Sequence, residues 1–118
     1  MFFMVRTEFR RPSEMDDLEL VFLQGDEQRR ATALQNAGVI RQLWREPDTS
    51  IAWGLWRTDD EHALLSALRS LPAFHWMTVT YREVIDHPNA IRTPDPNPRS
   101  GPDWRASGAE AVGSIAFG

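Results

Sequence analysis

The chain has 118 residues and a formal net charge of −4 at pH 7, with 42% hydrophobic and 25% charged residues. This length predicts a single domain, and the negative charge argues against nucleic-acid binding, which needs a basic patch. The sequence contains no cysteine, which excludes disulfides, thiol nucleophiles and iron–sulfur clusters. It has neither an 18-residue apolar run nor a secretory leader pattern, and it predicts a cytoplasmic protein with no membrane association.

The first third of the chain predicts a strand followed by a helix. Residues 2–9 alternate in the period of a β-strand, with Phe3, Val5, Thr7 and Phe9 on one face. A helix is expected over residues 14–37, with Ser13 as its N-cap and Gly38 as its C-terminal stop. Gly25 lies in the middle of this helix and costs about 1 kcal/mol relative to alanine, which is compatible with a bend or a break.

The middle of the chain predicts a hairpin, a second helix and a last strand. Residues 39–46 ("VIRQLWRE") and 51–57 ("IAWGLWR") are strand patterns joined by the turn "PDTS". Residues 58–71 predict a helix with a leucine stripe, in which Thr58 and Glu61 fit a capping box. Residues 75–85 predict the fourth strand.

This order of elements, β-α-β-β-α-β, is that of the ferredoxin-like α+β fold. It predicts an antiparallel sheet with both helices on one face. The last three strands carry large apolar side chains at both parities, so the open face of the sheet is expected to meet a second subunit. Residues 1–91 form the predicted domain, and residues 92–118, rich in Pro, Gly and Ser, are expected to form an extended tail.

A carboxylate on the first predicted helix is the main candidate for chemistry. Its stripe of residues three and four apart is Leu20, Leu23, Glu27, Ala31 and Leu34. Burial on such an apolar face raises a carboxylate's pKa toward the range of a general base or acid near neutral pH. The alternative is that the helix breaks at Gly25 and exposes Glu27 to water.

Two arginines in the second strand are candidate anion ligands. Arg41 and Arg45 alternate with Val39 and Leu43 on one face, and guanidinium groups bind carboxylates through two parallel hydrogen bonds. The alternative is that they form ion pairs with acidic side chains.

Tryptophans and histidines supply the remaining candidates. Trp44 and Trp53 are candidates for pocket walls, or else ordinary core or interface residues. His75, at the start of the fourth strand, is a candidate for proton transfer or ligand contact. His62 is expected to be exposed, and His87 to make a structural hydrogen bond. No spacing typical of a metal site, a P-loop or a dinucleotide fingerprint occurs, so no metal site is predicted.

Several of these stretches together resemble the muconolactone delta-isomerase family, which includes chloromuconolactone dehalogenase-like proteins. The resemblance is collinear over residues 1 to about 91, in the stretches "MFFMVR" (1–6), "DE" (26–27), "RQLWR" (41–45), "LP-x-F-x-x-M" (71–77) and "HP-x-x-I" (87–91). It implies a subunit of the dimeric α/β-barrel type, assembled as dimers and, in the isomerases, as a decamer. It also implies a pocket between sheet and helices that needs no cofactor.

The resemblance implies a reaction as well. The family shifts a double bond in an unsaturated lactone that carries an acetate arm. Glu27 would move the proton, with His75 as a second catalytic candidate. Arg41 or Arg45 would hold the carboxylate arm or stabilise the enolate. Asp26, Trp44 and Trp53 are the further candidates for substrate contact.

The sequence departs from the family pattern inside the implied pocket. Gln28 replaces a lysine, Met4 and Gln42 replace histidines, and residues 52–54 replace an Asn-containing element. A divergent isomerase, lyase or cyclase is therefore expected, acting in biosynthesis on a small unsaturated lactone or a cyclic, polyketide-like substrate. Two alternatives remain: a cofactor-free monooxygenase of the dimeric α/β-barrel type, or a non-catalytic ligand-binding or assembly module.

Overall fold

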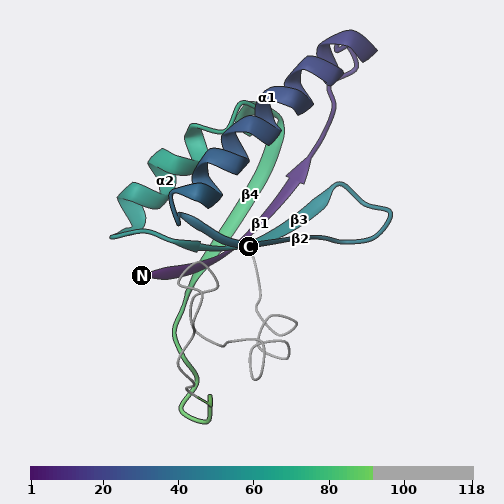
Figure 1. Cartoon of the computed structure of the whole chain (residues 1–118). Helices are drawn as coiled ribbons and strands as arrows, with labels where there is room; N and C mark the ends of the chain where they lie inside the picture. The colour runs from purple at the N-terminus through teal and green to yellow at the C-terminus, as the bar shows by residue number, and fades with distance from the viewer. Residues whose placement is uncertain (92–118) are drawn as a thin grey trace.

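A computed structural model describes residues 1–91 of the chain (Figure 1). Its elements are β1 (Phe2–Phe9), α1 (Asp17–Asn36), β2 (Ile40–Arg45), β3 (Ile51–Arg57), α2 (Glu61–Arg69), the 3₁₀ turn η1 (Phe74–Trp76) and β4 (Met77–Val84). This order confirms the predicted ferredoxin-like α+β fold. The predicted tail, residues 92–118, lies outside the described residues.

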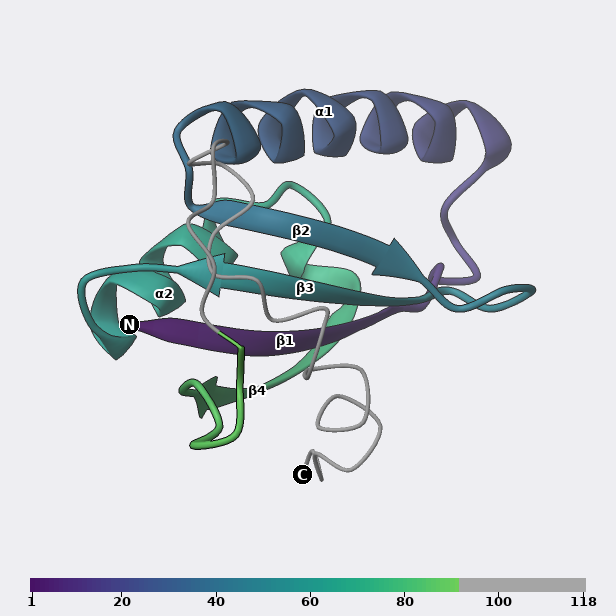
Figure 2. The ribbon, with the colours of Figure 1, turned by 60° about the horizontal axis from the view of Figure 1, so that its bottom comes forward.

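The four strands form one antiparallel sheet in the order β2-β3-β1-β4. The first strand therefore lies inside the sheet, paired with β3 on one side and β4 on the other, as Figure 2 shows. A strand with two neighbours has its backbone hydrogen bonds satisfied on both edges. This explains why the purely apolar start of the chain can be placed at the centre of the fold.

The core lies between the helices and one sheet face. Phe3 and Val5 of β1 and Trp56 of β3 pack there against residues of both helices. The helices contribute Leu34 from α1 and Leu64 and Leu68 from α2, all at most 4% exposed. Burying a side chain of this size stabilises the fold by roughly 1.5–3 kcal/mol. Both helices therefore cover the same face, as the sequence predicted.

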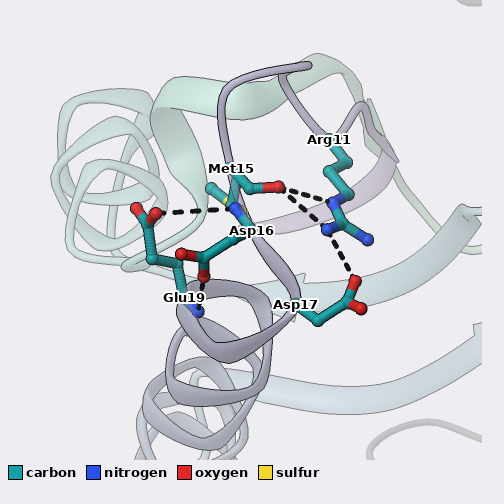
Figure 3. A network of polar contacts seen from close by, with 5 residues as sticks. All are labelled: Arg11, Met15, Asp16, Asp17 and Glu19. Carbon is teal, nitrogen blue, oxygen red and sulfur yellow. Dashed lines mark hydrogen bonds and ion pairs between the residues drawn. The ribbon is translucent and has the colours of Figure 1, made fainter.

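The first helix begins later than predicted, and a different residue caps it. Asp16 is the N-cap: its side chain accepts a hydrogen bond from the Glu19 backbone N–H at 2.8 Å, and the Glu19 side chain reaches back to the Asp16 N–H (Figure 3). Arg11 donates to the Met15 carbonyl and pairs with Asp17 at 2.8 Å. The prediction of Ser13 as the cap is wrong, because a second acceptor with Glu three residues later stands just beyond it.

The first helix continues without interruption through Gly25. A bend or break there was compatible with the sequence, but the helix reaches Asn36. Glycine weakens a helix without breaking it when neighbouring residues hold it against a sheet. The main consequence is that Glu27 keeps its place in the helical period.

The cap of the second helix also differs from the prediction. Asp60, not Thr58, accepts the hydrogen bond from the backbone N–H of Ala63, at 2.7 Å. Glu61 does not complete a capping box with Thr58. Its carboxylate accepts a hydrogen bond of 2.8 Å from the hydroxyl of Tyr81 on β4. This bond raises the pKa of Tyr81, with burial adding to the effect.

The second strand contains an irregularity that the alternation pattern did not predict. Ile40 pairs with Trp56, whereas Leu43 pairs with Gly54, with a register shift between Ile40 and Gln42. A bulge of this kind moves the residues after it to the opposite face. Ile40 and Leu43 therefore share the helix-facing side, and the simple alternation of Val39, Arg41, Leu43 and Arg45 is not kept.

The second sheet face is also apolar in part. Met4 pairs with Leu55, and Leu55 pairs in turn with Gln42, so these side chains lie on the face opposite Phe3 and Val5. Trp44 follows on this side of β2. Large apolar groups thus occur at both parities, as predicted.

Neither helix of the described part, residues 1–91, has the length and apolar character that a membrane span requires.

Candidate functional site

A cavity of about 270 Å³ lies between α1 and the helix-facing side of the sheet. Its walls come from β1, α1, β2 and β3, from Leu71 in the turn after α2, and from the start of β4. Its polar lining groups are the side chains of Thr7, Glu27 and Ser50 and the indole of Trp56. The remaining lining residues are apolar, and a volume of this size suits a small molecule.

Glu27 places a carboxylate in the cavity wall. The sequence stripe predicted that it faces the interior, and the structure confirms this: Leu20, Leu23, Glu27 and Ala31 are half-buried and Leu34 is buried. Oε1 of Glu27 accepts a hydrogen bond of 3.0 Å from the backbone N–H of Ala73. Burial raises the pKa of Glu27 above its ordinary value of 4.5, and the hydrogen bond from Ala73 lowers it by a smaller amount.

The sheet side of the cavity is shaped by a glycine. Gly54 is buried, and a Cβ atom at this position would come within 2.7 Å of Nε1 of Trp56 and 3.1 Å of a Leu43 methyl group. The indole edge of Trp56 therefore lies directly over the Gly54 backbone. Glycine at position 54 is a steric requirement of this packing.

Two of the predicted site residues line the cavity. These are Glu27 and Trp53. The Trp53 indole lies on the second sheet face beside Trp44, where its N–H donates a hydrogen bond of 2.6 Å to the Glu46 carboxylate, so Trp53 borders the cavity only from within β3. Asp26 is adjacent to Glu27 in sequence but is exposed and forms an ion pair with Arg29, because successive helix residues point about 100° apart.

The other predicted site residues lie elsewhere among the described residues. Arg41, Trp44, Arg45 and His75 are not part of the cavity lining. Arg45 and His75 are exposed, and the ring of His75 contacts those of Phe74 and Trp76 edge-on. Their roles in catalysis and binding stay predictions. The other histidines follow expectation: His62 is exposed, and Nδ1 of His87 accepts a hydrogen bond of 3.0 Å from the Asn89 N–H.

Sequence reasoning missed Trp56, Thr7 and Ser50 as lining residues. The signal for Trp56 was present in β3, where Ala52, Gly54 and Trp56 alternate as two small residues followed by a large one. Small residues beside a tryptophan on one strand face leave space next to its ring. Helix α1 closes that space from above, and the strand pattern alone does not predict where the helix lies.

The site is one carboxylate in an otherwise uncharged pocket. Glu27 is the single ionisable side chain among the described residues that line the cavity. Within residues 1–91 no group of three or more His, Asp or Glu side chains is arranged to hold a metal ion. A half-buried carboxylate with a raised pKa is suited to accept and return a proton near neutral pH. The fold and the pocket thus define a small α+β protein with a candidate proton-transfer site.

Comparison with known proteins places this chain in a family. A profile of the muconolactone delta-isomerase family matches residues 1–90. Muconolactone delta-isomerases of Pseudomonas putida and Pseudomonas aeruginosa are 28% and 30% identical over 95 residues, covering 80% of this chain and 99% of each relative. A crystal structure of muconolactone isomerase superimposes with a TM-score of 0.74 at 29% identity, covering 80% of this chain and 99% of that one.

The chain therefore belongs to the muconolactone delta-isomerase family, as a divergent member. The family resemblance expected from the sequence is confirmed.

Proposed function

We propose that the protein is a cofactor-independent isomerase, or a related proton-transfer enzyme such as a lyase or cyclase. Its substrate is a small unsaturated lactone or a cyclic, polyketide-like compound, handled in biosynthesis, and Glu27 is the general base and acid. The observation that supports this most is the position of Glu27, the single ionisable group among the described residues of an apolar cavity. Family membership supports the isomerase class.

The chemistry follows from one carboxylate acting twice. In its ionised form Glu27 removes a proton from a carbon activated by a carbonyl group. The electron pair left behind moves into the conjugated system and places negative charge on the carbonyl oxygen. Protonated Glu27 then returns the proton to a different carbon, and the double bond has moved. Burial raises the pKa of Glu27, which makes its protonated form more accessible than that of an exposed carboxyl and suits it to both proton transfers.

Further parts of the proposal rest on the sequence. His75 is a second candidate for proton transfer, and Asp26, Arg41, Trp44, Arg45 and Trp53 are candidates for substrate contact. We also propose a cytoplasmic homo-oligomer, either a dimer or a decamer built from dimers. Large apolar side chains at both parities of the last three strands support pairing through the second sheet face. Light scattering of the full chain measures the oligomeric state.

A proton-exchange experiment tests the activity. The protein is incubated in deuterated water with muconolactone and a panel of unsaturated lactones and cyclic enones, and the products are followed by NMR. We expect deuterium in a ring carbon or a moved double bond with the wild-type chain, and loss of both with Glu27→Gln. Glu83→Gln, which neutralises an exposed carboxylate on β4, is the matched control. Oxygen consumption in place of exchange would favour a monooxygenase, and exchange that survives Glu27→Gln would reject Glu27 as the base.

A further inference from the structure

The charge of the cavity restricts the ligands that it can take. None of the described lining residues is arginine, lysine or histidine, and the single ionisable one is the acid Glu27. A ligand carboxylate in this cavity would lose water without gaining a positive partner, and it would lie near a second carboxylate. Both effects oppose binding, since an unpaired charge is costly in an apolar site. The lining therefore favours an uncharged ligand.

The cavity also offers a hydrogen-bond donor. The side chain of Trp56 lines it, with Nε1 lying over the open backbone of Gly54. Within the part of the chain that the structure describes, the Trp56 indole has no hydrogen-bond partner, whereas the Trp53 indole, on the opposite face of β3, is held by Glu46. An indole N–H can donate but not accept. It therefore pairs with a ligand atom that accepts, such as a carbonyl oxygen.

The donor and the base lie on different walls. Trp56 projects from β3 in the sheet, and Glu27 projects from α1 above it. A ring held between these walls can present an oxygen to one and a C–H group to the other. This is the arrangement that proton abstraction next to a carbonyl requires, because the negative charge appears on the oxygen while the proton leaves the carbon.

We propose that Trp56 is a substrate-binding residue whose indole N–H donates a hydrogen bond to the carbonyl oxygen of an uncharged cyclic ester or ketone, with the acidic C–H facing Glu27. This inference rests on the proposed function, which it deepens by naming the substrate class and a second residue. As the proton passes to Glu27, the electron pair shifts onto the carbonyl oxygen, and the N–H bond to that oxygen strengthens. When Glu27 returns the proton to another carbon, the carbonyl is restored.

The test observes the indole N–H directly. The chain has five tryptophans, so the full-length ¹⁵N-labelled protein gives five indole signals in a ¹H–¹⁵N NMR spectrum. Trp56→Phe assigns the relevant one by its absence. The probes are 2(5H)-furanone and cyclohex-2-enone, which are uncharged, and muconolactone, which carries a carboxylate. We expect both uncharged probes to shift the Trp56 signal downfield, and muconolactone to bind more weakly than either.

Affinity and turnover give a second readout. Removing one hydrogen bond is expected to weaken binding of the uncharged probes about tenfold in Trp56→Phe. The value of kcat for proton exchange falls further than KM rises, since this bond is strongest in the transition state. Trp76→Phe, which changes a tryptophan outside the described cavity lining, is the matched control. Glu27→Gln should keep the Trp56 shift, because it removes the base but not the donor.

The outcomes separate this inference from the proposed function. If Glu27→Gln abolishes exchange while Trp56→Phe leaves binding and kcat unchanged, the proposed function stands and the role of Trp56 is rejected. If the Trp56 signal shifts but no compound exchanges, ligand recognition stands and the activity is rejected. A Trp56 signal that stays in place while signals of Ala31 and Ala52 move, tighter binding of muconolactone than of the uncharged probes, or no binding of either uncharged probe overturns the inference. If Trp56→Phe does not fold, single Trp→Phe variants at the other four tryptophans assign the Trp56 signal by elimination, and the wild-type spectra then decide the inference.

Discussion

The backbone N–H of Ala73 donates a hydrogen bond of 3.0 Å to Oε1 of Glu27, a residue 46 positions earlier in the chain. This bond joins the middle of α1 to the turn that follows α2, and it fixes one carboxylate oxygen at the wall of the cavity. It favours the charged form of Glu27, while burial favours the neutral form and has the larger effect. The protonation of Glu27 is thus set by the packing of the two helices.

The raised pKa of Glu27 predicts how stability depends on pH. A carboxyl whose pKa is higher in the folded state holds its proton more tightly there, so its contribution is fully present below the ordinary value of 4.5 and is lost as pH rises through the folded pKa. The Glu27→Gln variant has no carboxyl at this position to ionise, so it does not lose this stability as the pH rises. We therefore expect the free energy of unfolding of the variant, relative to wild type, to increase between pH 4 and pH 8. Urea denaturation across this range measures it, and a difference that stays constant or decreases would contradict the prediction.

The hydrogen bond to Ala73 predicts a shift in the same pKa. Ala73→Pro removes the N–H donor, which takes away a stabilisation of the charged carboxylate. We expect the pKa of Glu27 to rise further. In the pH profile of the proton-exchange rate, the fall in rate on the acid side should therefore begin at a higher pH. A ¹³C NMR titration of the Glu27 carboxyl measures the pKa. Ala73→Gly keeps the donor and should leave the pKa nearly unchanged; an equal shift in both variants would point to altered packing instead.

Two glycines predict opposite responses to alanine. At Gly54 the added methyl group would meet the Trp56 indole at 2.7 Å, so Gly54→Ala should destabilise the protein by about 1–3 kcal/mol and displace that ring. At Gly25 the nearest atom is 3.6 Å away, in the Arg29 guanidinium, so Gly25→Ala should stabilise α1 by about 0.5–1 kcal/mol. Chemical denaturation measures both values, and tryptophan fluorescence reports the ring. Destabilisation by Gly25→Ala would show that α1 needs glycine there.

The start of α1 predicts which of two residues caps it. Asp16→Ala removes the acceptor for the Glu19 N–H and should cost about 1 kcal/mol of stability. Ser13→Ala should cost almost nothing, since the Ser13 hydroxyl bonds only to the neighbouring exposed Glu14 among the described residues. Thermal unfolding of the two variants is the measurement. A larger loss in Ser13→Ala would place the cap where the sequence suggested.

The sequence by itself determined the order of elements and the face that Glu27 occupies. β1 and β3 have the predicted bounds, because alternation over seven or eight residues between turn signals is a strong pattern. The spacing from Leu20 to Leu34 fixed the inner face of α1, and a helix keeps its period through a single glycine. The helix caps were predicted less well, since several acceptors stand near each helix start and the backbone geometry selects one.

Only the tertiary structure decided what surrounds Glu27. The bulge between Ile40 and Gln42 changed which side chains of β2 face the helices, and no local pattern marks such a shift. The pairing of Gly54 with Leu43 brought an open backbone under the Trp56 indole, and the turn after α2 brought the Ala73 N–H to the carboxylate. These contacts join residues far apart in the chain. They depend on how strands pair and helices pack, whereas the periodicity of a sequence records only which side of each element is buried.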